Sequence, residues 1–133
     1  MATPLSGLQV LDLSSGPTGG LATMILADFG ATVRRVIDPE YDCLNNILSA
    51  PMWLRGKSVV KSLRLQDVDV VVISQPHAHA NCTFEDCRDQ NPTLIYCEVS
   101  AMGSDVNIPM YEGIVAAKAG RMKQFESILI DQA

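Results

Sequence analysis

Residues 8–37 of this 133-residue chain, LQVLDLSSGPTGGLATMILADFGATVRRVI, decide its fold. Leu8–Leu13 is a short apolar run, which is typical of a buried strand. Ser14–Gly20 is rich in serine, glycine and proline and predicts a turn. Leu21–Phe29 has apolar residues at helical spacing, and Ala31–Ile37 predicts a second strand. A strand–helix–strand unit of this kind predicts two parallel strands joined by a right-handed crossover.

The rest of the chain continues the alternation of strands and helices. Strands are predicted at Ser58–Leu63, Val68–Ser74 and Thr93–Ser100, and helices at Thr83–Gln90 and Tyr111–Met122. Val68–Ser74 is mostly β-branched and apolar, which is typical of a central parallel strand. The alternation predicts an α/β fold, a Rossmann-like, doubly wound, mainly parallel sheet in three layers. We expect this domain over residues 1–122 and a short divergent tail over 123–133.

Composition excludes several classes of protein. Hydrophobic residues make up 47% of the chain, so a disordered chain is excluded. The net charge of −5 argues against nucleic acid and acidic membranes as partners. There is no apolar run of membrane-spanning length and no secretory signal, so we expect a cytoplasmic protein.

The cysteines and histidines offer a metal site as one alternative. Cys43, Cys82, Cys87 and Cys97 fit no common zinc spacing, and we expect reduced thiols, with Cys97 buried in a strand. His77 and His79 lie close to Cys82 and Cys87 in the sequence, so a folded-back loop would bring four ligands together. Polar loop residues are the simpler interpretation, and we predict no metal.

Ligands of doubly wound sheets bind where the strands end, here after Leu13, Ile37, Ser74 and Ser100. The candidate cofactor-binding residues are Ser15, Gly16, Pro17, Thr18, Gly19, Arg55, Lys57, Ser74 and Gln75. The backbone of Ser14–Gly20 is suited to a nucleotide or pantetheine at a helix N-terminus, but the same residues suit an ordinary turn. Arg55 and Lys57 suit either a phosphate contact or a solvated basic loop.

Six segments in register resemble the class III coenzyme A (CoA) transferases, the group of formyl-CoA transferase, carnitine CoA-transferase and α-methylacyl-CoA racemase. Their residues are Pro4–Leu13, Leu26–Val33, Arg55–Ser58, Asp67–Val72, Asn91–Cys97 and Tyr111–Met122. The resemblance covers the amino-terminal portion of the family. Tyr111 stands where racemase members have a histidine, so the resemblance does not favour racemase chemistry.

The resemblance implies acyl transfer through a nucleophilic aspartate. In the family, that aspartate lies beyond the helix that Tyr111–Met122 matches, past the end of these 133 residues. We therefore predict no catalytic residue here, no acyl transfer by this chain alone, and CoA or acyl-CoA as a ligand. The alternatives are a protein–protein assembly module and one half of a split CoA transferase. We also expect a homo-oligomer, a dimer that uses the region after Met110.

Overall fold

A computed structural model describes residues 3–37, 44, 47–61, 64–74, 82–100 and 112–121. The chain divides into two units, Met1–Val99 and Ser100–Ala133. In the second unit, the described residues are Ser100, the helix α4, Glu112–Lys118, and the turn after it. The predicted tail at 123–133 lies outside the described residues.

The first unit opens with the predicted strand–helix–strand segment. Strand β1 spans Gln9–Leu13, helix α1 spans Pro17–Asp28, and strand β2 spans Thr32–Val36. The helix begins four residues before the apolar pattern that predicted it, because its first turn, Pro-Thr-Gly-Gly, contains no large apolar residue. It ends at Asp28, and Gly30, two residues beyond, adopts a positive φ of 100° that favours glycine.

The remaining elements alternate along the chain. They are α2 Ala50–Leu54, β3 Lys57–Val60, the 3-10 helix η2 Leu65–Asp67, β4 Val70–Ser74, α3 Phe84–Gln90 and β5 Ile95–Val99. Thr83 is the N-cap of α3, as its sequence predicts.

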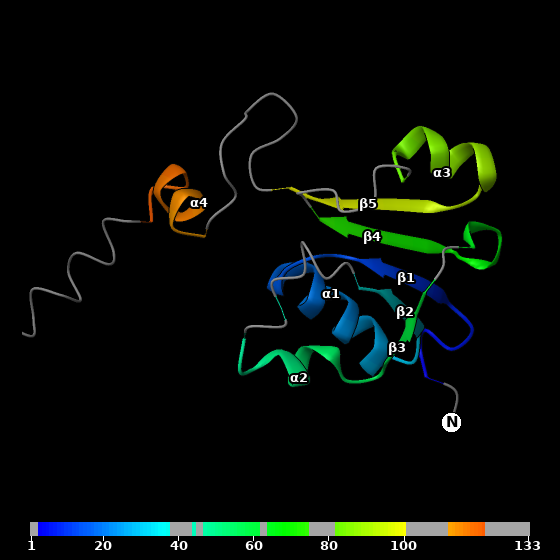
Figure 1. Ribbon diagram of the computed structural model, residues 1–133, viewed down its shortest axis with the longest axis horizontal. Helices are drawn as coiled ribbons and strands as arrows, with labels where there is room; N and C mark the ends of the chain where they lie inside the picture. Colours follow the sequence, from blue (N-terminus) through cyan, green and yellow to red (C-terminus); the bar gives the residue numbers. More distant parts are fainter. Residues whose placement is uncertain are drawn as a thin grey trace, which may run out of the picture. The chain divides into compact units, whose positions relative to one another are not determined.

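The five strands form one sheet in the order β3-β2-β1-β4-β5, and every neighbouring pair is parallel (Figure 1). The chain runs from β1 outward to β2 and β3, then returns to β4 on the other side of β1. The strand order therefore reverses between β1 and β4, in the middle of the sheet. The predicted Rossmann-like parallel sheet is confirmed.

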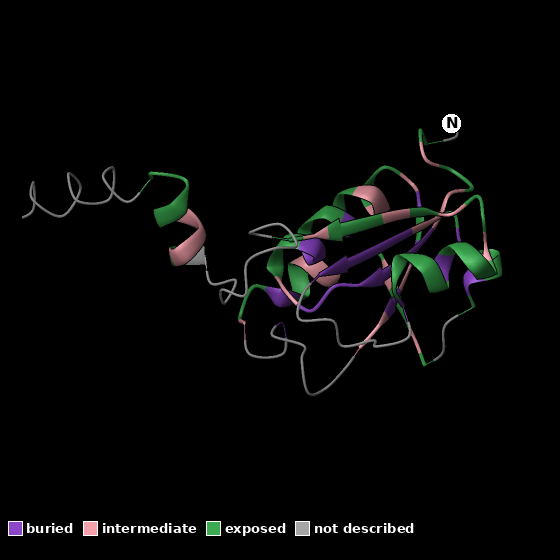
Figure 2. Cartoon of the chain, turned by 90° about the horizontal axis from the view of Figure 1, so that it is seen from above, coloured by how far each residue is buried: buried purple, intermediate pink, exposed green. Residues whose placement is uncertain are grey.

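Both faces of the sheet are covered. Alternate residues of the central strands point to opposite faces. Leu11 and Val71 belong to a core cluster that includes Cys87 of α3, and Val10 and Val72 belong to a second cluster packed against Leu26 of α1. The predicted three-layer arrangement follows, and Figure 2 shows the buried central strands in purple.

One prediction about the core is wrong. Cys97 was expected to be a buried strand residue, and it is exposed. Strand β5 lies at the edge of the sheet, beside β4 alone, and its burial alternates weakly along its length. An edge strand and a central strand have the same local pattern in the sequence, so the pattern could not separate them. Among the described residues, no helix is both long and apolar enough to cross a membrane.

Candidate functional site

The point where the strand order reverses brings together two residues predicted from the sequence. Ser15 follows the carboxyl end of β1, and Ser74 is the last residue of β4. The Ser15 backbone N–H donates to Ser74 Oγ at 2.9 Å, and the two hydroxyl oxygens lie 3.3 Å apart. Both residues are largely buried. In parallel sheets, ligands bind outside the carboxyl ends of the strands at this kind of reversal.

The first turn of α1 lies beside this pair of serines. Gly16 precedes the helix in an extended conformation, and no side chain caps it. The N–H groups of a first turn have no partner within the helix, and Pro17 has no N–H to leave unpaired. Thr18 is exposed and Gly19 is buried. The free end of α1 therefore presents backbone N–H groups and the positive end of the helix dipole next to the serines.

Close packing fixes the position of this turn. A Cβ atom added to Gly19 would lie 2.2 Å from the Cβ of Ser14, so the helix could not approach β1 with any larger residue there. A Cβ atom at Gly20 would lie 3.3 Å from Leu44 and 3.8 Å from the Cβ of Trp53. Gly19 is therefore required for the close approach of α1 to β1, whereas Gly20 has only a tight contact with the Leu44 side chain.

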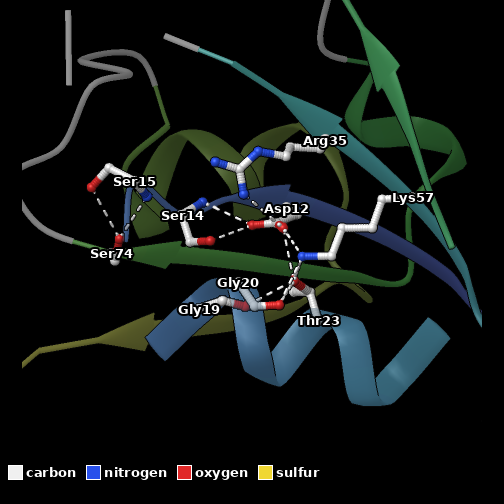
Figure 3. A network of polar contacts seen from close by, with 9 residues as sticks. All are labelled: Asp12, Ser14, Ser15, Gly19, Gly20, Thr23, Arg35, Lys57 and Ser74. Carbon is white, nitrogen blue, oxygen red and sulfur yellow. Dashed lines mark hydrogen bonds and ion pairs between the residues drawn. The ribbon is translucent and has the colours of Figure 1, made fainter. Parts of the chain in front are cut away.

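A buried carboxylate, that of Asp12, joins the turn and the start of α1 to the sheet (Figure 3). Asp12 of β1 is fully buried. Its Oδ1 accepts from the backbone N–H of Ser14 at 3.0 Å, and its Oδ2 accepts from the Thr23 hydroxyl of α1 at 2.7 Å. Arg35 of β2, also buried, contributes an ion pair with the same Oδ2 at 3.4 Å. Asp12 thus connects β1, β2 and α1 directly under the turn.

Lys57, at the start of β3, completes this network. Its side chain is buried, and its Nζ donates to Asp12 Oδ2 at 2.9 Å, to the Gly20 carbonyl at 2.8 Å and to the Thr23 hydroxyl at 2.6 Å. Burial lowers the pKa of Lys57, and the negative charge of Asp12 opposes that shift. All three N–H groups of the ammonium are therefore used inside the protein, between the sheet and α1.

The other predicted basic residue lies elsewhere. Arg55 is exposed and makes a two-point ion pair with Asp28, the last residue of α1, at 2.6 and 3.2 Å. Since α1 has 12 residues, this pair lies about 16 Å along the helix from its first turn. Gln75 lies outside the described residues, as do His77 and His79. Of the predicted set, the structure groups Ser15, Gly16, Pro17, Thr18, Gly19 and Ser74 at one place.

Asp12, Thr23 and Arg35 were not among the residues predicted from the sequence. A signal was available, because Asp12 is the one charged residue in the otherwise apolar core of β1. A charged residue inside a strand buried on both faces needs a buried partner of opposite charge. Nothing local in the sequence shows that this partner would be Lys57, 45 residues later.

Comparison with known proteins gives consistent results. The sequence model described as "CoA-transferase family III" matches residues 5–52. The probable fatty acyl-CoA transferase Rv3272 of Mycobacterium tuberculosis is 32% identical to this chain, in an alignment that covers 90% of this chain and 38% of that protein. Formyl-CoA:oxalate CoA-transferase of Escherichia coli is 28% identical, in an alignment that covers 90% of this chain and 36% of that protein.

Solved structures agree with these sequence matches. The crystal structure of Rv3272 superposes with a TM-score of 0.74 at 30% identity, over 90% of this chain and 39% of that one. A CAIB/BAIF family protein from Brucella suis superposes with a TM-score of 0.73 at 22% identity, over 90% of this chain and 40% of that one, and supports the fold alone. The chain thus spans well under half the length of the curated relatives that it matches.

Proposed function

We propose that this chain, a member of CoA-transferase family III that matches the amino-terminal part of its relatives, provides the coenzyme A-binding face of an acyl-CoA transferase. The proposal rests on the hydrogen bond between Ser15 and Ser74 at the point where the strand order reverses, beside the uncapped first turn of α1. We propose that a phosphate or the pantetheine amides of CoA accept hydrogen bonds from the backbone of this turn.

The charges of the site support a division of roles. A CoA phosphate is attracted by the N–H groups and dipole at the start of α1. Lys57 and Arg35, next to Asp12, add two positive charges to its one negative charge just below the turn. We assign Lys57 a positioning role, because its ammonium is committed to Asp12, Gly20 and Thr23.

The same network argues against acyl transfer by the described residues themselves. A nucleophilic carboxylate must reach the carbonyl carbon of a thioester. Asp12, the buried carboxylate closest to the turn, is fully buried and accepts hydrogen bonds from Ser14, Thr23 and Lys57. We propose that it has a structural role, and that acyl transfer requires a carboxylate from outside the described residues.

Calorimetric titration of the purified chain with CoA tests the proposal. We expect binding, and we expect Ser74→Ala to weaken it about tenfold, or about 1.4 kcal/mol, because the Ser15 N–H loses its acceptor and the turn loses its fixed position. Ser58→Ala on β3 is the matched control, since Ser58 lies at the edge of the sheet away from the turn. We expect it to bind CoA like the wild type.

Two results would remove the proposal. A flat titration with the folded wild-type chain would end the CoA-binding part. Turnover of an acyl-CoA donor by the purified chain would end the prediction that this chain alone transfers no acyl group.

Self-association is a second candidate function, favoured by the outer side of α1. Leu21, Ile25 and Phe29 are 43%, 45% and 52% exposed and are spaced by four residues, so they lie on one side of the helix. The opposite side is buried against the sheet. A helix that is apolar all round is typical of an element covered in a larger assembly. We propose that this side joins two copies of the chain.

Light scattering tests the self-association. We expect a dimer for the wild type and a monomer for Ile25→Glu. Leu48→Glu is the control that stays dimeric, because Leu48 is a fully exposed apolar residue outside α1. A monomeric wild type at high concentration would contradict the proposal. The region after Met110, where the sequence analysis placed the dimer contact, is described over residues 112–121 alone.

A further inference from the structure

Two buried thiols face each other at the start of α3, on the sheet face opposite α1. Cys82 and Cys87 are 2% and 0% exposed, and both belong to the core cluster around Leu11 and Val71. Their Sγ atoms lie 3.2 Å apart, and both thiols are free. The candidate CoA site does not use either of them.

The helix start holds these two residues in a fixed relation. Thr83 and Asp86 form a capping box, in which the Asp86 N–H donates to Thr83 Oγ1 at 3.2 Å and the Thr83 N–H donates to Asp86 Oδ2 at 3.3 Å. Cys82 precedes the cap and Cys87 is the fourth helical residue. These are the two positions where apolar side chains pack as a hydrophobic staple at helix starts. In this chain, the staple is made of two thiols.

Strand β5 secures the same segment from the other side. The Tyr96 hydroxyl donates to the backbone carbonyl of Cys82 at 3.3 Å. The rings of Phe84 and Tyr96 pack edge to face, with centroids 5.8 Å apart and an interplanar angle of 75°. Tyr96 thus holds the chain at Cys82 and Phe84 against strand β5.

We propose that Cys82 and Cys87 are a reversible disulfide modification site, formed by exchange with a small-molecule disulfide. The thiolate of one cysteine attacks a sulfur of the small disulfide, which releases one small thiol and leaves a mixed disulfide. The second cysteine, as thiolate, then attacks the protein sulfur of that bond and releases the second small thiol. In total, the two cysteines lose two electrons and two protons. The small-molecule disulfide gains them and is reduced to two thiols.

The geometry favours the second, intramolecular step. A disulfide S–S bond is about 2.05 Å long, so the sulfurs need to approach by about 1.1 Å from their present positions. The first step is slow, because both thiols are buried and burial raises the pKa of Cys82 to about 12. The first turn of α3 must therefore open for the oxidant to enter, and the bond that forms is then shielded from reductants once the turn closes.

Tryptic mapping of the full chain tests the proposal. The protein is incubated at pH 8 in oxidised glutathione, unreacted thiols are blocked with N-ethylmaleimide, and trypsin is added. Cleavage after Arg64 and Arg88 releases residues 65–88, which contain Cys82 and Cys87 and no other cysteine. Cys43 and Cys97 are released on two other peptides, so each thiol is followed separately.

We expect the 65–88 peptide to carry no maleimide and to be lighter than its reduced form by two hydrogen atoms. Dithiothreitol should restore the form with two maleimides. Recovery of two maleimides on 65–88 while the exposed Cys97 has fully reacted would overturn the proposal. Stable glutathione adducts on both cysteines would also overturn it. In Cys87→Ser, Cys82 has no partner, so the glutathione adduct on Cys82 should persist.

Discussion

Replacing Asp12 by asparagine should destabilise the first unit severely, because it removes the negative charge between two buried cations. Asp12 Oδ2 lies 2.9 Å from Lys57 Nζ and 3.4 Å from Arg35 Nη1, and all three side chains are almost completely buried. Removing one partner of a buried ion pair costs about 3–5 kcal/mol, since the remaining charge is left in a medium of low dielectric constant. The free energy of unfolding of a native domain is about 5–15 kcal/mol, so this loss is a large fraction of the total stability.

Urea unfolding followed by the fluorescence of Trp53 measures this loss. Trp53 is the single tryptophan, and it lies in the first unit. With a denaturant slope of about 2 kcal/mol per molar urea, the expected loss moves the midpoint down by about 2 M. A variant that does not fold at all is consistent with the upper end of this range.

Asp28→Asn is the matched control, because it makes the same chemical change in an exposed ion pair. Asp28 and Arg55 are joined at 2.6 Å, but their side chains are 43% and 47% exposed. Water solvates the separated charges, so we expect no measurable shift of the midpoint. Equal midpoints for the two variants would refute the reasoning, since the buried network would then contribute no more than a surface pair.

Three further predictions concern other parts of the first unit. Gly19→Ala should destabilise the first unit by about 1–3 kcal/mol, because the new Cβ overpacks against Ser14. Gly16→Ala is the control and should be tolerated, because nothing lies within 4 Å of its new Cβ. The urea midpoints of the two variants test this difference. Stability should fall as the pH rises from about 9 to 12, because burial raises the pKa of Cys82 and of Tyr96 to about 12, and the unfolded chain releases these protons first. Cys82 contributes up to about 1.4 kcal/mol per pH unit between pH 9 and 12, and the more exposed Tyr96 contributes less because solvent screens its charge. A stability that does not change between pH 9 and 11 would contradict this. Thr83→Ala should cost about 1 kcal/mol by removing the cap of α3, and an unchanged midpoint would show that the cap is redundant.

Local patterns in the sequence were sufficient for the fold. The apolar run before Ser14, the glycine turn and the spaced apolar residues up to Phe29 predicted the first strand and helix to within a few residues. Parallel strands place their carboxyl ends on the same edge of a sheet. That rule placed Ser15 and Ser74 in one candidate site, although 59 residues separate them.

The contacts beneath the turn could not be predicted in the same way. The sequence predicts Lys57 as a phosphate ligand or a solvated residue, because the residues around it do not show where β3 pairs. Its position follows from the register of β3 against β2, where Val33 faces Lys57. That register brings the ammonium to Asp12, and it depends on contacts across the whole sheet. The exposure of Cys97 was missed for a related reason, since the edge of a sheet is a property of its strand order.

The most direct test of the central claim is a nuclear magnetic resonance titration of the ¹⁵N-labelled chain with CoA. We expect the amide signals of the turn to shift as CoA is added and to reach saturation at the same CoA concentration; these are the signals of Ser15, Gly16, Thr18 and Gly19. The amide signals of β3 and α3 should not shift. Shifts confined to other elements, or no shifts at all in the folded chain, would contradict the claim that this turn binds CoA.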